Sequence, residues 1–200
     1  MDMQARNHNY HFALLLLFLF LSWYSATAQD LVRSSCAHAR YPALCIKTLT
    51  PYATPSATAL DLAKSAVRVS LAHSRSLSTY VTTLHSQMQQ QSSSSAERVA
   101  LNDCIAQIAD SVDEFTRTLS ELKNMQVGTT SFQWHMSNAQ TWTSTSLTNC
   151  YSCMNGFGGV VSKVGLDVKQ RVNSLGMLTS NALYLITRIG GAANGVRGGN

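Results

Sequence analysis

The apolar residues between positions 101 and 122 recur in alternating steps of four and three. This spacing places them along one side of an α-helix and is typical of a helix that packs in a bundle. Such a helix needs neighbours that cover its apolar side, so the pattern predicts an all-α fold. The series consists of Leu101, Ile105, Ile108, Val112, Phe115, Leu119 and Leu122.

Three other segments repeat the alternation, at about 56–90, 131–157 and 164–189. The series in 131–157 is the weakest, because it includes polar members such as Thr143 and Ser146. Four amphipathic helices of this length must bury their apolar sides against one another, and short links between them favour antiparallel neighbours. The sequence therefore predicts an up-down-up-down four-helix bundle.

The flanking segments are expected to differ from the bundle, which is assigned to residues 56–190. All three prolines lie in residues 29–55, and proline interrupts helices, so short helices separated by turns are expected there. The glycine-rich residues 191–200 are expected to form a flexible tail. Residues 29–190 together have the size of one domain with its own core.

Residues 1–28 have the pattern of a secretory signal peptide. Arg6 supplies a positive charge, residues 13–21 are apolar without interruption, and Ala26 and Ala28 are the small residues of a cleavage site. A membrane anchor is the alternative, but spanning a bilayer needs roughly 20 apolar residues. The pattern predicts a secreted, extracellular chain with no membrane association after processing.

The chain has a formal net charge of +5, with its lysines and arginines scattered along the sequence. A positive balance favours acidic partners or an anionic polysaccharide. A nucleic-acid-binding protein is not expected, because no run of basic residues interleaved with aromatic residues is present.

Five cysteines in an exported chain leave at least one thiol unpaired. Cys36 and Cys45 flank a turn, so a local bridge between them is natural. Cys104 lies near the start of the second long helix and Cys153 near the end of the third, and these ends are adjacent in an antiparallel pair. Cys150 lies one turn before Cys153 and competes for the same partner. No second cysteine pair or histidine cluster accompanies Cys150 and Cys153, so neither a metal site nor another cofactor is predicted.

The sequence contains no recognisable catalytic motif. Asp110, Asp113 and Glu114 are close together, but their position opposite the apolar series predicts a solvated helix face. His135 is isolated from other histidines and is expected on a helix surface. A protein that binds a partner is therefore favoured over an enzyme.

Trp134 and Trp142 are eight residues apart, which separates them by about 80° around a helix. This angle allows one ring to pack in the bundle while the other contacts a partner. Tryptophan is enriched among the residues that dominate binding energy. Either ring is a candidate anchor.

Motifs in four parts of the chain, between about 30 and 190, resemble the plant invertase/pectin methylesterase inhibitor domain. They occur in the order of that family and cover nearly all of the sequence after the leader. They are Leu31–Cys36 with Ala39–Cys45, Ala100–Cys104 with Val112–Glu114, Gln140–Ser144 with Leu147–Asn149 and Cys153–Phe157, and Leu178–Leu183.

This resemblance implies an N-terminal helical hairpin, in residues 29–55, attached to the four-helix bundle. It implies one disulfide within the hairpin, Cys36–Cys45, and one between the second and third bundle helices, Cys104–Cys153. Cys150 is then an addition to the family pattern, either as a free thiol or in a bridge to another molecule. The resemblance also implies inhibition of a target by stoichiometric binding in the plant apoplast or cell wall. We expect the chain to act as a monomer.

The invertase-inhibiting branch of the family carries a Pro-Lys-Phe motif between the second and third bundle helices. The corresponding link here, 125–132, has neither proline nor lysine, which favours pectin methylesterase as the target. The expected action is to cover the pectin-binding cleft and limit pectin de-esterification, with Gln140, Thr141 and Ser144 as candidate contacts. The alternatives are inhibition of acid invertase and a non-inhibitory structural role on anionic wall pectin.

Overall fold

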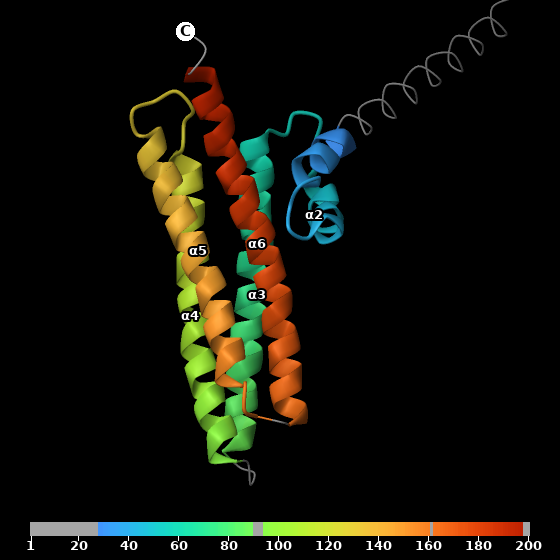
Figure 1. The fold of residues 1–200 in the computed structure, drawn as a ribbon, viewed down its shortest axis with the longest axis vertical. Coiled ribbons are helices and arrows are strands. Elements are labelled where there is room, and N and C mark those ends of the chain that lie inside the picture. The colour runs from blue at the N-terminus through green and yellow to red at the C-terminus, as the bar shows by residue number, and fades with distance from the viewer. Residues whose placement is uncertain (1–27, 90–93, 161, 198–200) are drawn as a thin grey trace, which may run out of the picture.

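The computed structural model describes residues 28–89, 94–160 and 162–197, and their regular structure is entirely helical (Figure 1). Two short helices and a 3₁₀ turn precede four long helices. The elements are a first helix at 28–36, α2 (Pro42–Leu49), η1 (Thr50–Tyr52), α3 (Ala59–Met88), α4 (Ser95–Asn124), α5 (Phe132–Gly156) and α6 (Lys163–Arg197).

The four long helices form the antiparallel up-down-up-down bundle that the spacing predicts. Each of them packs against its neighbour in the sequence, and α3 also packs against α6, which closes the bundle. Figure 1 shows α4 and α5 as one pair and α3 and α6 as the other. The predicted all-α fold is confirmed.

The apolar series explains most of the core. In α4, the series members Leu101, Ile108, Phe115 and Leu122 are fully buried, whereas Ile105, Val112 and Leu119 lie partly buried at the edge of the core. In α5, even the polar members are fully buried, as Thr143 and Ser146 show. The weak apolar pattern of α5 therefore reflects a polar, small-residue contact line and not a helix at the surface.

That contact line lies between α4 and α5. The hydroxyl oxygens of Thr118 and Thr143 are 3.3 Å apart, and each hydroxyl also donates to the backbone carbonyl four residues earlier in its own helix. Cys104 and Cys153 form a disulfide across the same line, with their Cα atoms 4.5 Å apart. Small side chains thus allow α4 and α5 to approach closely.

The first helix and α2 form a hairpin that lies beside α3 and α6, away from α4 and α5 (Figure 1). The disulfide Cys36–Cys45 joins the two arms, with a Cα–Cα distance of 5.7 Å. Asn181, buried on α6, fastens the turn to the bundle: its Oδ1 accepts from the Tyr41 N–H at 3.1 Å, and its Nδ2 donates to the Tyr41 carbonyl at 2.9 Å. Two motifs that are 140 positions apart therefore meet.

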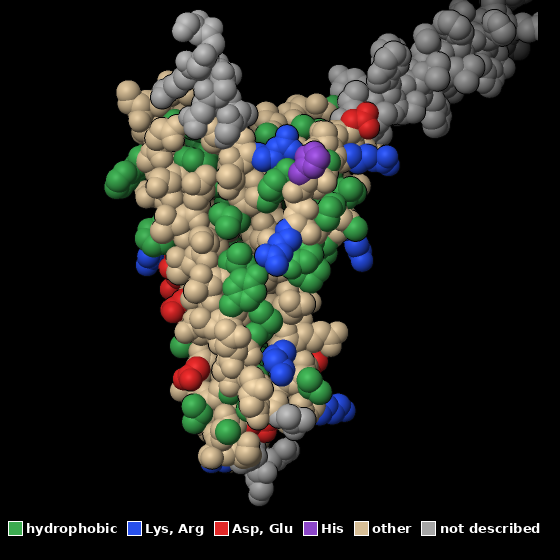
Figure 2. All heavy atoms as spheres, viewed as in Figure 1, with side chains coloured by type: hydrophobic (Ala, Val, Ile, Leu, Met, Phe, Trp, Pro, Cys, Tyr) green, Lys and Arg blue, Asp and Glu red, His purple; other side chains and the backbone are tan. Residues whose placement is uncertain are grey.

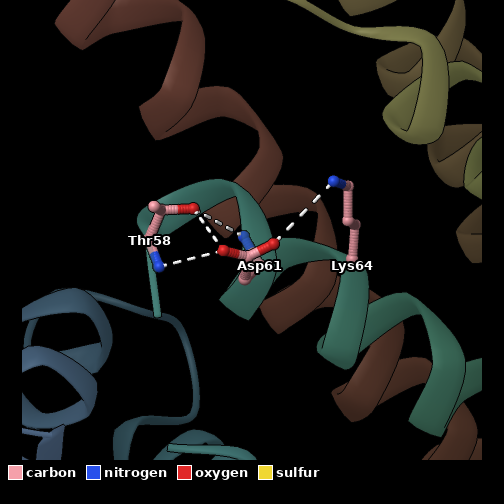
Figure 3. A network of polar contacts seen from close by, with 3 residues as sticks. All are labelled: Thr58, Asp61 and Lys64. Atoms are coloured by element: carbon pink, nitrogen blue, oxygen red, sulfur yellow. Dashed lines mark hydrogen bonds and ion pairs between the residues drawn. The ribbon is translucent and has the colours of Figure 1, made fainter. Parts of the chain in front are cut away.

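A capping box sets the start of α3 three residues later than the predicted start at 56 (Figure 3). The Asp61 N–H donates to the Thr58 hydroxyl at 3.2 Å, and the Thr58 N–H donates to the Asp61 carboxylate at 3.1 Å. The hydroxyl of Thr58 also bonds the carboxylate, and these bonds lower the pKa of Asp61. Reciprocal bonds of this kind satisfy backbone donors that a helix start leaves free.

At the other end of the chain, α6 continues to Arg197, so the predicted boundary at residue 190 between the bundle and a flexible tail is not where the helix ends. The prediction relied on glycines at 190 and 191. Glycine weakens a helix by about 1 kcal/mol relative to alanine, but unlike proline it keeps its N–H for the helical hydrogen bond.

The predicted signal peptide, residues 1–28, lies outside the described residues except for Ala28. Among the residues that are described, none of the helices combines the length and the hydropathy that crossing a membrane requires.

Candidate binding surface

Helix α5 is exposed along one side, yet none of its 25 residues is Asp, Glu, Lys or Arg. The uncharged stretch extends beyond the helix, from Asn124 to Ser162. In Figure 2 the charged side chains of the viewed face lie mainly along its left edge and over its right half, and uncharged atoms cover much of the rest. This stretch is visible in the sequence itself as the long interval without Asp, Glu, Lys or Arg between Lys123 and Lys163.

The three predicted contact residues, Gln140, Thr141 and Ser144, lie together on this side of α5. With Thr145 and Thr148 they line a shallow open groove, which we call the α5 groove. Thr141, Ser144 and Thr148 are exposed, and the other two are half-buried. The structure therefore groups the predicted residues and adds two threonines one turn further along the helix.

Two of the four hydroxyl groups in the α5 groove, those of Thr145 and Thr148, are oriented by hydrogen bonds within the helix. Thr145 donates to the Thr141 carbonyl at 3.0 Å, and Thr148 donates to the Ser144 carbonyl at 3.1 Å. Because these hydrogens are engaged, the oxygens are left to accept hydrogen bonds from a partner. Threonine side chains are also stiff. The α5 groove is thus a rigid surface that offers acceptors and methyl groups.

The two tryptophans of α5 differ in how far their side chains are exposed. Trp134 is 67% exposed, whereas Trp142 is half-buried and has the Arg117 guanidinium 5.1 Å from its ring centre. Trp134 precedes Thr141 by seven residues, which corresponds to about 20° around the helix and about 10 Å along it. Trp134 therefore lies on the same side of α5 as the groove, beyond one of its ends.

His135 belongs to a polar contact between α4 and α5 and not to a free helix surface. Its Nδ1 lies 2.7 Å from Glu121 Oε2, and Asn138 Nδ2 donates to Glu121 Oε1 at 3.3 Å. One carboxylate of α4 thus holds two residues in the first turns of α5. Together with the Thr118–Thr143 contact and the Cys104–Cys153 bridge, it fastens α5 to α4 along its length.

The remaining cysteine, Cys150, is a buried free thiol. Burial raises its pKa to about 12, so the reactive thiolate is scarce at neutral pH. A bridge to a second molecule would need the sulfur at the surface, and the structure therefore favours the free thiol of the two alternatives. The observed disulfides, Cys36–Cys45 and Cys104–Cys153, are the pairs that the resemblance implies.

The acidic cluster on α4 is only partly a solvated face. Asp110 and Asp113 are exposed, but Glu114 is half-buried, and its Oε2 is a buried atom with no hydrogen-bond partner. Burial raises the pKa of Glu114. Glu114 precedes the fully buried Thr118 by one turn, which places it beside the α4–α5 contact line, and the prediction of a fully solvated cluster is corrected accordingly.

A second polar groove lies between α3 and α6, lined in part by His73, Tyr80, Asp167 and Arg171. The Tyr80 hydroxyl donates to Asp167, and Arg171 Nε donates to the same carboxylate oxygen at 2.9 Å. The Arg171 guanidinium also lies 4.2 Å from the Tyr80 ring centre. Hydrogen bonds from Tyr80 and Arg171 lower the pKa of Asp167, and burial lowers that of His73. Tyr80, Asp167 and Arg171 thus bond one another, and the contacts of Tyr80 join α3 to α6.

Within the described part of the chain, no group of three or more His, Cys, Asp or Glu side chains could hold a metal ion. The α5 groove also contains neither a nucleophile–base pair nor a carboxylate. Its chemistry suits the binding of a macromolecular surface.

Comparison with known proteins gives a consistent result. The family Plant invertase/pectin methylesterase inhibitor matches residues 30–185. The chain is 41% identical over 167 residues to Pectinesterase inhibitor 3 of Arabidopsis thaliana, which covers 81% of this chain and 80% of the relative. It is 38% identical to Pectinesterase inhibitor 11 of the same plant, covering 81% of each.

A crystal structure of a mutant form of a pectin methylesterase inhibitor from Arabidopsis has a similar fold. The TM-score is 0.62 at 15% identity, with 76% of this chain and 92% of that chain covered. The named relatives are inhibitor proteins and not enzymes, as the sequence predicts for this chain. The matched residues span both the hairpin and the bundle, and the chain therefore belongs to the plant invertase/pectin methylesterase inhibitor family.

Proposed function

We propose that this chain is a secreted inhibitor of pectin methylesterase that acts in the plant cell wall. It binds the enzyme stoichiometrically through the exposed side of α5, covers the pectin-binding cleft and thereby limits pectin de-esterification. The observation that carries this proposal is an exposed, rigid and uncharged helix face in a chain of this family. Interface cores are depleted in charged residues and enriched in tryptophan and tyrosine, which fits α5.

Rigidity is the physical basis of the proposed inhibition. A surface that is already ordered loses little conformational entropy when it docks, so more of the contact energy appears as affinity. The Cys104–Cys153 bridge, the Thr118–Thr143 contact and the Glu121 contact to α5 supply this order. An inhibitor of this kind needs no catalytic group, because excluding the polysaccharide from the cleft is sufficient.

The test is a titration of pectin methylesterase with the purified mature protein at an enzyme concentration well above the dissociation constant. Residual activity on methylated pectin should fall linearly and reach its minimum near one inhibitor per enzyme. A matched titration of acid invertase should leave sucrose hydrolysis unchanged, since the 125–132 link lacks proline and lysine.

A third arm measures binding to demethylated pectin by co-sedimentation, with and without added salt. Inhibition of invertase alone would contradict the choice of target. Retention on pectin with inhibition of neither enzyme would contradict the inhibitor role and support a wall-associated structural protein.

A further inference from the structure

Trp134 is the most exposed large hydrophobic side chain among the described residues. Single exposed apolar residues are common on proteins, so exposure alone has little meaning. Val127 and Tyr151 also lie in the stretch without charged residues, but Trp134 has the largest and most exposed side chain of the three. It lies on the helix side that carries the α5 groove, within the long stretch that has no charged residue.

We infer that Trp134 is the anchor residue with which this chain holds pectin methylesterase, an inference that rests on the proposed function. The indole ring would enter an apolar pocket of the enzyme surface, next to the area covered by the α5 groove. A tryptophan buries a large area on binding with few rotatable bonds, and such residues dominate interface energies.

The surroundings of Trp134 define the complementary surface. The Thr145 and Thr148 hydroxyls already donate within α5, so the enzyme surface opposite the α5 groove should supply hydrogen-bond donors. The absence of charged side chains on α5 means that an isolated charge at the centre of the enzyme surface would lose its hydration without gaining a partner. The partner surface is thus an apolar pocket beside uncharged donors.

The helix turn that bears Trp134 is held in place before any partner binds. The adjacent residue, His135, contacts Glu121, and Asn138 contacts the same carboxylate one turn later. Trp142 cannot take the same role without displacing Arg117 from its ring. The structure thus presents one tryptophan to a partner and covers the other.

The experiment compares Trp134→Ala with Tyr52→Ala, each measured by surface-immobilised binding to pectin methylesterase. Tyr52 is the matched control, because it is an aromatic residue 46% exposed on the hairpin, away from α5. Trp134→Ala should weaken binding at least about 30-fold, mainly through faster dissociation. Tyr52→Ala should change affinity less than about twofold, and Trp134→Phe should restore part of the loss. Both alanine variants should keep the wild-type helical circular dichroism.

A second readout follows the indole ring directly. In inhibitor labelled with 5-fluorotryptophan, the fluorine resonance that Trp134→Phe removes should shift on addition of unlabelled enzyme, while the Trp142 resonance stays in place. If the wild type binds and Trp134→Ala binds equally well, the anchor role is overturned. If the wild type does not bind the enzyme at all, the proposed function fails, which is a separate outcome.

Discussion

Single polar side chains decide how the separate parts of this molecule are joined. The Asn181 side chain accepts from the Tyr41 N–H and donates to the Tyr41 carbonyl, so one residue of α6 bonds both backbone groups of Tyr41. Glu121 has a similar role for α5, because its two carboxylate oxygens contact His135 and Asn138. Each residue thus joins two parts of the fold through both polar atoms at the end of its side chain.

Replacing Asn181 by alanine should lower the free energy of unfolding by about 1–3 kcal/mol, because the change leaves the Tyr41 N–H without its partner and removes one of the two donors to the Tyr41 carbonyl, which also accepts from the Cys45 N–H. Asn181→Asp should also destabilise, since the carboxylate loses the donor to the Tyr41 carbonyl. Asn173→Ala, at an exposed asparagine of α6, is the control and should change stability by less than about 0.5 kcal/mol. Urea denaturation followed by circular dichroism measures all three. An Asn181→Ala variant as stable as the control would show that the hairpin does not depend on this contact.

At the scale of the element, the helices differ in what they present to their neighbours. The contact between α4 and α5 combines small and hydroxyl side chains with the polar contact of Glu121 with His135, whereas that between α3 and α6 includes the hydrogen bond from the Tyr80 hydroxyl to Asp167. Two glycines of α6 lie close to other parts of the bundle. Gly176 packs against α5 near Cys150, and Gly165 lies in the first turn of α6 near Phe157.

These two glycines should respond differently to alanine. At Gly176 a Cβ atom would lie 3.6 Å from the Cβ of Cys150, an ordinary contact, so the gain in helix propensity should stabilise the protein by about 0.5–1 kcal/mol. At Gly165 a Cβ atom would lie 3.2 Å from Phe157 Cδ1 and 3.3 Å from Ser162 Oγ, so neighbours must shift and the gain should be lost. Thermal unfolding should rank Gly176→Ala above the wild type and Gly165→Ala below Gly176→Ala. The reverse order would mean that α5 and α6 are packed more tightly than the structure indicates.

The whole molecule combines a stable bundle with a hairpin that packs on one side of it. The two disulfides contribute differently to this arrangement. Cys36–Cys45 closes a short loop within the hairpin, with a sequence separation of 9, whereas Cys104–Cys153 joins two bundle helices across a separation of 49. The second bridge also fixes the helix that carries the proposed binding surface.

Removing the disulfides one at a time should therefore show which of them affects stability alone and which affects both stability and binding. On the chain-entropy view, Cys104→Ser with Cys153→Ser should cost about 4 kcal/mol of stability, and Cys36→Ser with Cys45→Ser about 2.7 kcal/mol. At a temperature where both variants are folded, only the first should bind pectin methylesterase more weakly than the wild type, because it releases one end of α5. Calorimetric unfolding and binding measured on the same preparations check this. Equal binding by both variants would show that the bridge is not needed to order the surface.

The four long helices follow from the order of residues along the chain, whereas the surroundings of individual side chains follow from how those helices pack. The spacing of apolar residues identified the four long helices, because helical periodicity is a local property of the chain. The same spacing could not show that Glu114 is half-buried, that Trp134 and not Trp142 is exposed, or that Asn181 holds Tyr41. Those features depend on which helices become neighbours and how closely they approach. The spacing does place Thr143 in the series and Thr141 outside it. Hydroxyl side chains fit both a surface and a small-residue helix contact, however, so only the packed structure shows that α4 and α5 approach closely enough to bury Thr143.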